Sequence, residues 1–215
     1  MHNYYKTNDF SQVIYSYISP YNGKKANILV SGGSVLPLFQ TPEIIGLDSS
    51  KWHVYLSDER ITSDPQLSNF RDMELYFTNI NCVLHPLKPD LVLPKFEVGI
   101  LGVGEDGHVA SLFPNHKILD STKYIEVIDD SPKYPPKRIT VTIMALKQVK
   151  ELVFLTPPKN GVIKNVFKPH HSIINRINHD LTFVVPTLYP DEEIIKKMDE
   201  DGTRAERNNE LKYFK

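Results

Sequence analysis

The chain has 215 residues, of which 40% are hydrophobic and 24% charged, and its formal net charge is −1. This is ordinary globular composition, and we expect one domain over residues 1–215. The near-neutral charge excludes a broad basic surface for nucleic acid, and no apolar run approaches the ~18 residues that would span a membrane. An anionic ligand would therefore have to be bound by local geometry.

The location is predicted from the cysteine content and the first residues. Cys82 is the only cysteine, which excludes an intramolecular disulfide and agrees with a reducing compartment. The first ten residues, MHNYYKTNDF, lack the apolar core of a signal peptide. We therefore expect a cytoplasmic protein that binds neither membrane nor nucleic acid.

Apolar, β-rich runs recur along the chain and predict strands, several of them buried on both faces. These runs are 26–30, 52–56, 96–102, 138–143, 151–155 and 181–185. Segments with helical spacing lie before, among and after these runs, at 10–18, 68–77, 159–167 and 191–200. The alternation predicts an α/β fold with a mostly parallel, doubly wound, Rossmann-like sheet flanked by helices. The highly charged end, 199–215, is expected to be a solvated helix or a frayed tail.

Parallel sheets bind ligands beyond the carboxyl ends of their strands, so the residues after each run are the candidates for a site. The run 26–30 leads into Ser31, Gly32, Gly33 and Ser34. Two glycines allow a tight turn with convergent N–H groups, two hydroxyls add donors, and a helix is expected just after. This pattern favours a phosphate site, with an ordinary strand-to-helix turn as the alternative. It lacks the spacing of a P-loop.

Three consecutive charged residues, Asp58, Glu59 and Arg60, follow the run 52–56 after Ser57. Because they come directly after a buried strand, we expect them to face the crevice rather than the core. The alternative is a solvated loop with an Asp–Arg ion pair.

The residues 102–107, GVGEDG, match the pattern G-x-G-x-x-G. The match lies in mid-chain, and Pro114 would cut the following helix short, so a nicotinamide or flavin site is not favoured. Asp106 and His108 instead suggest a general base with an orienting carboxylate, and Gly104 and Gly107 would leave room for a ligand. The alternative is a histidine that is hydrogen-bonded inside a turn.

Metal and cofactor sites find little support, and we expect neither. His108 and His116 are eight residues apart across a proline, and His170 and His171 are adjacent, which are not familiar ligand spacings.

Two cations stand at the starts of predicted elements, Arg138 at a strand and Lys159 at a helix. A basic residue at a helix N-terminus gains nothing from the helix dipole, which suggests an anion near Lys159.

Taken in order, these segments resemble the 6-phosphogluconolactonase family, which shares its fold with the glucosamine-6-phosphate deaminases. The matching segments are SGGS (31–34), DER (58–60), SN (68–69), GVGEDGHVASLFP (102–114), RITVT (138–142) and Lys159. The resemblance implies a fold of the glucosamine-6-phosphate deaminase/lactonase type. It also implies hydrolysis of 6-phospho-D-glucono-1,5-lactone to 6-phosphogluconate by water, without metal or cofactor. The enzyme would be functionally linked to glucose-6-phosphate dehydrogenase, and we expect a monomer or a weak homo-oligomer.

The resemblance also implies roles for individual residues. His108 would take a proton from water, Asp106 would orient it, and Arg60 would stabilise the developing oxyanion with backbone N–H groups of the glycine turn. Asp58 would hold Arg60 or bind sugar hydroxyls. The expected substrate and phosphate ligands are Ser31, Gly32, Gly33, Ser34, Asn69, Gly107, Arg138 and Lys159.

Two differences separate this chain from the deaminases. Deaminases carry a phenylalanine-asparagine-glutamate-proline run where this chain has residues 111–114, so Phe113 replaces the acid, and they usually carry a tyrosine in place of Arg60. Both differences favour the lactonase. The alternatives are a deaminase or isomerase of this fold and a non-catalytic sugar-phosphate-binding protein. Lys159 lacks the glycine that usually precedes it, which makes Lys164 its rival, and the chain diverges most beyond residue 170.

Overall fold

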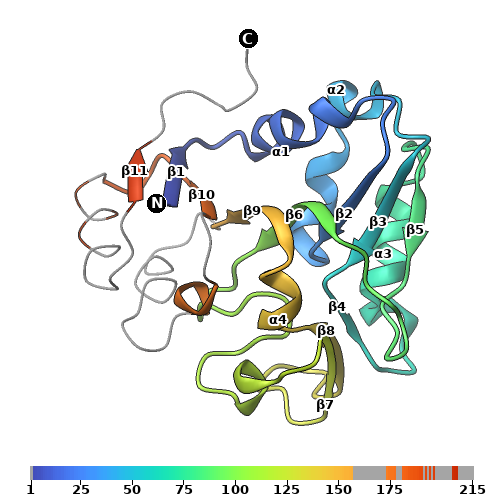
Figure 1. Cartoon of the computed structure of the whole chain (residues 1–215), viewed down its shortest axis with the longest axis vertical. Coiled ribbons are helices and arrows are strands. Elements are labelled where there is room, and N and C mark those ends of the chain that lie inside the picture. The colour runs from blue at the N-terminus through green and yellow to red at the C-terminus, as the bar shows by residue number, and fades with distance from the viewer. Residues whose placement is uncertain are drawn as a thin grey trace.

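The computed structural model describes residues 2–156, 173–177, 181–190, 192, 194, 196 and 205–207. Within them, eight parallel strands form the main sheet in the order β11-β1-β10-β9-β6-β2-β3-β5 (Figure 1). The strands are β1 (His2–Lys6), β2 (Ala26–Val30), β3 (Trp52–Leu56), β5 (Val83–His85), β6 (Phe96–Gly102), β9 (Val149–Leu155), β10 (Leu181–Val185) and β11 (Ala205–Arg207). The predicted α/β fold with a mostly parallel sheet is confirmed.

A second, antiparallel sheet corrects one predicted strand. It has three strands in the order β4-β8-β7, namely β4 (Asp58–Arg60), β8 (Arg138–Val141) and β7 (Ile125–Ile128). The run 138–143 was expected in the parallel sheet, but its strand ends at Val141 and lies in this small sheet instead, toward the bottom of the view in Figure 1. All four β8 residues are buried, so an apolar run alone does not show which sheet the strand joins.

The helices are short, and three of the four α-helices in the described residues have a side-chain cap at the N-terminus. They are α1 (Phe10–Ile18), α2 (Pro42–Ile45), α3 (Asn69–Tyr76) and α4 (Ile143–Leu146). Asp9 Oδ1 accepts a hydrogen bond from the Gln12 N–H at 3.0 Å, and Ser68 Oγ accepts one from the Arg71 N–H at 3.2 Å. The helices predicted over 10–18 and 68–77 are thereby confirmed. Five 3₁₀ helices are also present in the described residues, at Ser19–Tyr21, Gly33–Phe39, Pro65–Leu67, Lys117–Asp120 and Ile174–Arg176.

Two C-terminal predictions have different outcomes. The helix predicted over 159–167 lies outside the described residues, and of the one over 191–200 only residues 192, 194 and 196 are described, each as helical. The end of the chain was expected to be a solvated helix or frayed tail, which is wrong for Ala205–Arg207. These residues pair in parallel with β1, because an edge strand offers unpaired N–H and C=O groups to any extended segment beside it.

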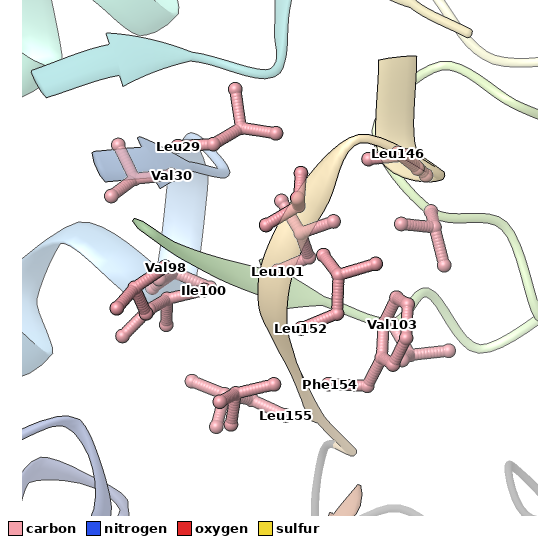
Figure 2. Packing of buried hydrophobic residues seen from close by; sticks show 14 of the residues in the cluster. Leu29, Val30, Val98, Ile100, Leu101, Val103, Leu146, Leu152, Phe154 and Leu155 are labelled. Carbon is pink, nitrogen blue, oxygen red and sulfur yellow. The ribbon is translucent and has the colours of Figure 1, made fainter. Parts of the chain in front are cut away.

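The core lies around the central strands β2, β6 and β9, whose apolar side chains interlock in Figure 2. Leu29, Ile100 and Leu152 are at most 1% exposed, and burying such a side chain contributes roughly 1.5–3 kcal/mol. Gly99 allows Leu152 this position, since a Cβ on Gly99 would lie 2.7 Å from Leu152 Cδ2. The strands that lead to the candidate site therefore end in fixed positions.

The strand order places a switch point between β2 and β6. From β2 the chain proceeds outward through β3 to β5, and from β6 it proceeds the other way through β9 to β10. Loops that leave the carboxyl ends of β2 and β6 diverge, which opens a crevice at that edge of the sheet. In the part of the chain that is described, no helix is both long and apolar enough to cross a membrane.

Candidate active site

A cavity of about 190 Å³ lies beyond the carboxyl ends of β2, β3 and β6. Nine of the sequence-predicted residues line it: Ser31, Gly32, Gly33, Ser34, Asp58, Arg60, Asn69, His108 and Arg138. Asp106 stands behind His108, and Gly107 is not among the lining residues. Lys159 and its rival Lys164 lie outside the described residues. Residues from five separate segments thus meet at one point, and three of these segments follow the carboxyl ends of β2, β3 and β6, as predicted.

Asp106 and His108 form a hydrogen-bonded pair in the turn after β6. His108 Nδ1 lies 2.5 Å from Asp106 Oδ1. The turn is closed by the Gly107 N–H, which donates to the Gly104 carbonyl at 2.9 Å, and Gly107 adopts a φ of 86° that favours glycine. The Gly104 N–H in turn donates to the His108 carbonyl at 2.8 Å. With Nδ1 engaged, Nε2 is the ring nitrogen left for a water molecule.

The glycines of this turn have roles that were not expected. Gly104 lines the cavity, and it also leaves room for His108, since a Cβ there would lie 2.0 Å from His108 Cε1. Gly107 was expected to bind substrate, but its N–H is already donated inside the turn. The N–H groups of both glycines are used to close the turn, so neither serves as an oxyanion donor in this geometry.

Electrostatics keep Asp106 ionised. Burial acts to raise the pKa of this carboxyl, but the hydrogen bond from His108 and the positive charges of His108 and Lys133 outweigh it, so the pKa lies well below its usual value. Lys133 Nζ is 3.3 Å from the same oxygen, Oδ1, that contacts His108. Asp106 is therefore an anion at neutral pH.

Asp58 is a buried anion, only 6% exposed, with a full set of partners. Ser111 Oγ donates to its Oδ2 at 2.7 Å, and Arg138 Nη1 lies 4.0 Å from that oxygen. Its backbone carbonyl accepts from Asn69 Nδ2 at 2.9 Å. The nearest guanidinium is thus that of Arg138, so the expected Asp–Arg contact is formed with a distant residue and not with Arg60.

Arg60 and Arg138 face the cavity as cross-strand partners of β4 and β8. Burial and the neighbouring charge of Arg60 lower the pKa of Arg138, and Asp58 and Glu59 oppose that change. Arg60 Nη1 donates to the Leu67 carbonyl at 3.0 Å, while its Nε is buried without a hydrogen-bond partner. Because Arg60 lines the cavity, its guanidinium group is a positive charge within reach of an anionic ligand.

Arg138 mainly holds the loop 133–135 through hydrogen bonds to its carbonyl groups. Its Nε donates to the Pro135 carbonyl at 2.7 Å, and its Nη2 donates to the carbonyls of Tyr134 at 3.0 Å and Lys133 at 3.2 Å. Nη1 remains to face Asp58 and the cavity. Arg138 therefore fixes the loop before β8 and offers one amino group to a ligand, which is a narrower role than the phosphate ligand we expected.

Glu59 points away from the crevice, contrary to the expectation for all three charged residues. Its Oε1 accepts the N–H groups of Arg60 at 2.6 Å and Asn69 at 2.7 Å, and its Oε2 accepts the Phe70 N–H at 2.8 Å and the Ser68 hydroxyl at 2.9 Å. The carboxylate thus caps the N-terminus of α3, where unpaired N–H groups and the helix dipole attract a negative charge. Sequence reasoning missed this role because the partners are about ten residues away.

The loop after β2 is partly engaged within the protein. Ser31 Oγ accepts the Gly102 N–H at 3.2 Å and lies 3.4 Å from Ser57 Oγ, so this hydroxyl joins β2, β3 and β6. Gly33, at a φ of 64°, opens the short 3₁₀ helix Gly33–Phe39, which is the helix expected after this loop. Gly32 must be glycine because a Cβ would lie 2.2 Å from Asn69 Cγ. Ser34 is exposed at the mouth of the cavity.

A phenylalanine packs against the candidate base. The ring centroids of His108 and Phe113 are 5.0 Å apart, and Phe113 is buried. In place of the short helix expected after His108, Val109 forms isolated β-bridges with Val103 and Leu112. Ala110 adopts a φ of 52°, which is uncommon for a residue other than glycine. The position at which the deaminases carry an acid is thus apolar and in contact with the base.

The roles of three residues at or beside the site were not predicted, namely those of Lys133, Ser111 and Glu59. Lys133 looked like an ordinary exposed lysine in a proline-rich loop, and no local pattern signals its contact with Asp106.

A larger cavity of about 810 Å³ adjoins the first, and both are lined by Ser34, Gly102 and Gly104. Among the described residues, no three His, Cys, Asp or Glu side chains gather as metal ligands.

Comparison with known proteins agrees with this architecture. The family described as glucosamine-6-phosphate isomerases/6-phosphogluconolactonase matches residues 73–173. A probable 6-phosphogluconolactonase 5 of Arabidopsis thaliana is 31% identical over 54% of this chain and 63% of its own length. A probable 6-phosphogluconolactonase 4, chloroplastic, of Oryza sativa subsp. indica is 32% identical over 54% of this chain and 47% of its own length. The chain thus spans about half to three fifths of these two curated relatives.

Among solved structures, a 6-phosphogluconolactonase from Thermotoga maritima superposes with a TM-score of 0.71. The match covers 86% of this chain and 99% of that one, at 21% sequence identity. At this identity the likeness establishes the fold.

Proposed function

We propose that the chain belongs to the glucosamine-6-phosphate isomerase/6-phosphogluconolactonase family and that it hydrolyses 6-phospho-D-glucono-1,5-lactone to 6-phosphogluconate. The observation that carries the proposal is the Asp106–His108 pair at the wall of a cavity that Arg60 and Arg138 also line. A base with an oriented ring and guanidinium groups across from it suit water attack on a carbonyl whose oxygen becomes negative.

The proton path follows from the histidine geometry. A water molecule attacks C1 of the lactone while His108 Nε2 takes one of its protons, and Nδ1–H remains bonded to the Asp106 carboxylate. The C1–ring oxygen bond then breaks, and the same proton passes from Nε2 to the departing ring oxygen, which becomes the C5 hydroxyl. Lactone and water give the acid, which ionises, so no covalent intermediate is required.

The charges of the site fit the two ends of such a substrate. The guanidinium group of Arg60, which lines the cavity, is the proposed donor to the tetrahedral oxyanion. Ser31–Ser34, the Nη1 group of Arg138, and Lys159 are the proposed phosphate ligands; Asn69 and Asp58 are proposed to bind sugar hydroxyls. Phosphate binding away from the reacting carbon would hold the carbonyl in position for attack. The buried Phe113 beside His108 supports the lactonase over the amino-sugar reaction.

Three wider proposals accompany this function. We propose a cytoplasmic location, a functional link to a dehydrogenase that forms the lactone, and a monomer or weak homo-oligomer. The rice relative carries the description chloroplastic, which is a property of that protein. Expression of a fluorescent fusion in the source cell and light scattering of the purified chain test the first and third of these.

The activity is tested by a coupled assay. Glucose-6-phosphate dehydrogenase generates the lactone in a weakly buffered solution, the chain is added, and acid release is compared with spontaneous hydrolysis between pH 6 and 8. We expect faster lactone loss that saturates with substrate. No acceleration at any pH would disprove the lactonase. Ammonia release from glucosamine-6-phosphate would instead support a deaminase, and binding of 6-phosphogluconate without turnover would support a non-catalytic binding protein.

A further inference from the structure

The loop between β7 and β8 brings a second cation to the catalytic pair. Lys133 Nζ lies 3.3 Å from Asp106 Oδ1, the oxygen that also contacts His108 Nδ1 at 2.5 Å. Lys133 also lines the larger cavity beside Gly104. A single carboxylate oxygen, Asp106 Oδ1, therefore contacts both the Lys133 ammonium and the His108 imidazole.

The backbone of Lys133 is held in place by hydrogen bonds to two buried residues, Ser131 and Arg138. Arg138, itself 5% exposed, donates from Nη2 to the Lys133 carbonyl at 3.2 Å. The Ser131 hydroxyl donates to the same carbonyl at 2.9 Å and accepts the Lys133 N–H at 3.2 Å. The loop position is thus fixed by a residue of the cavity wall, and the side chain leaves the loop close to Asp106.

The charge of the ammonium bears directly on the base. A carboxylate that is shared with an ammonium presents less negative charge to the imidazole than one that contacts the imidazole alone. Less negative charge favours the unprotonated ring, which is the form that accepts a proton from water. The pair also meets other charges: Asp58, Arg60 and Arg138 line the cavity with His108, and Glu105 adjoins Asp106 in the chain.

We propose that Lys133 is a positioning residue of this site, which holds the Asp106 carboxylate in place and shares its charge so that His108 remains an active base to lower pH. This inference rests on the proposed function, in which His108 is the general base. Lys133 acts through Asp106 and touches no reacting atom in this role.

The experiment is the pH profile of kcat/KM from pH 5 to 8 for the wild type, Lys133→Gln and Lys133→Arg. We expect the acid limb of Lys133→Gln to move to higher pH by about 0.5 unit, a size typical of a partly exposed ion pair. Lys133→Arg should restore the wild-type limb, because it keeps the charge. Added NaCl should move the acid limb of the wild type toward that of Lys133→Gln, because salt screens the ammonium charge. It should leave the acid limb of Lys133→Gln unchanged.

Lys137→Gln is the matched control, since Lys137 is an exposed lysine of the same loop. Profiles of Lys133→Gln and Lys137→Gln that both superpose on the wild type would overturn the inference. An NMR titration of the His108 ring, compared between wild type and Lys133→Gln, gives a readout without turnover. If the wild type is inactive but the His108 titration differs between wild type and Lys133→Gln, the proposed function is refuted and the effect of Lys133 on His108 is retained. If the wild type is active but the two titrations coincide, only the effect of Lys133 is refuted.

Discussion

The imidazole of His108 is held on three sides. Asp106 bonds Nδ1, the Phe113 ring packs at a centroid distance of 5.0 Å, and Gly104 closes the side of Cε1. Each of these contacts limits the directions in which the ring can turn, so that Nε2 keeps one orientation. Rigid placement of a general base is what makes its proton transfer efficient.

Removal of the base tests the residue on which the proposed mechanism depends. His108→Ala should lower kcat by roughly 10²–10⁴, the usual contribution of a general base, with little change in binding of 6-phosphogluconate measured by calorimetry. His116→Ala is the matched control, because His116 Nε2 and Asp130 Oδ1 form a similar pair at 2.9 Å that does not line the cavity. Activity that survives in His108→Ala would place the base elsewhere.

A methyl group on Gly104 should act through the same ring. The Cβ would lie 2.0 Å from His108 Cε1, so the ring would have to leave its present position beside Asp106. We expect Gly104→Ala to lose at least ~10-fold in kcat, but no more than the histidine deletion, and to keep 6-phosphogluconate binding. Gly104→Ala at wild-type kcat would show that the ring position is not needed for activity.

The residues of the site were predicted where the signal is local. Ser31–Ser34, Asp58, Arg60 and His108 each follow a buried strand in the sequence, and the topology of a parallel sheet brings such positions together. Glu59 and Lys133 were missed in their actual roles, because each is defined by partners that only the tertiary structure supplies. The role of Gly104 was likewise hidden, since a glycine pattern does not say whose atoms fill the space it leaves.

At the scale of elements, one carboxylate joins β4 to α3. Glu59 Oε1 and Oε2 together accept four hydrogen bonds, two of them from the first backbone N–H groups of the helix. The same contact places Asn69, whose side chain holds the Asp58 carbonyl and packs against Gly32. The short strand and the short helix thus support each other through a side chain that does not enter the cavity.

Glu59→Gln should therefore destabilise the protein and loosen the site together. An amide has one acceptor oxygen, so two of the four donors lose their acceptor, and we expect a loss of about 2 kcal/mol in the free energy of unfolding. Urea denaturation gives this value, and KM should rise in parallel. Glu43→Gln is the control, an exposed acid in the first turn of α2, with an expected change within ~0.5 kcal/mol. Equal changes in the two variants would contradict the capping role.

Strands that are continuous apolar runs were predicted from the sequence, whereas strands with exposed residues were not. β2, β3 and β6 lie at the predicted residues, because each is a continuous apolar run bounded by turn residues. β5 and β7 have partly exposed residues and no such run, and they were missed. β8 was predicted as a strand but in the wrong sheet, since its burial comes from packing that a single run does not encode.

At the scale of the whole molecule, the strand order was beyond sequence reasoning. Alternation predicts that a parallel sheet forms, but the neighbours of a strand are set by contacts between distant segments, such as β1 with β10 and β11. The switch point between β2 and β6, which opens the crevice, is a property of this order. A single domain over residues 1–215 remains a prediction, and one cooperative calorimetric transition would support it.

The far edge of the main sheet carries a pH-sensitive pair that is separate from the site. His53 Nδ1 and His85 Nε2 are 2.8 Å apart, and His85 stacks on Tyr55 with ring centroids 4.1 Å apart. Burial and the charge of His53 lower the pKa of His85 below its ordinary value of 6.5. The short N···N contact requires a proton on one nitrogen and a lone pair on the other, so it is lost when both rings are protonated.

The folded protein should consequently lose stability in mild acid. Because the His85 pKa is lower in the folded state, the unfolded chain binds more protons as the pH drops below about 6.5, and the free energy of unfolding falls until the folded pKa is passed. Urea denaturation at pH 7.5 and 5.5, where carboxylates stay ionised, should show a smaller loss for His85→Phe, which keeps an aromatic ring against Tyr55. Equal losses in both proteins would mean that the pair does not contribute. Asp106 does not titrate between these two pH values, so this decline in stability is separable from any shift in the acid limb of activity.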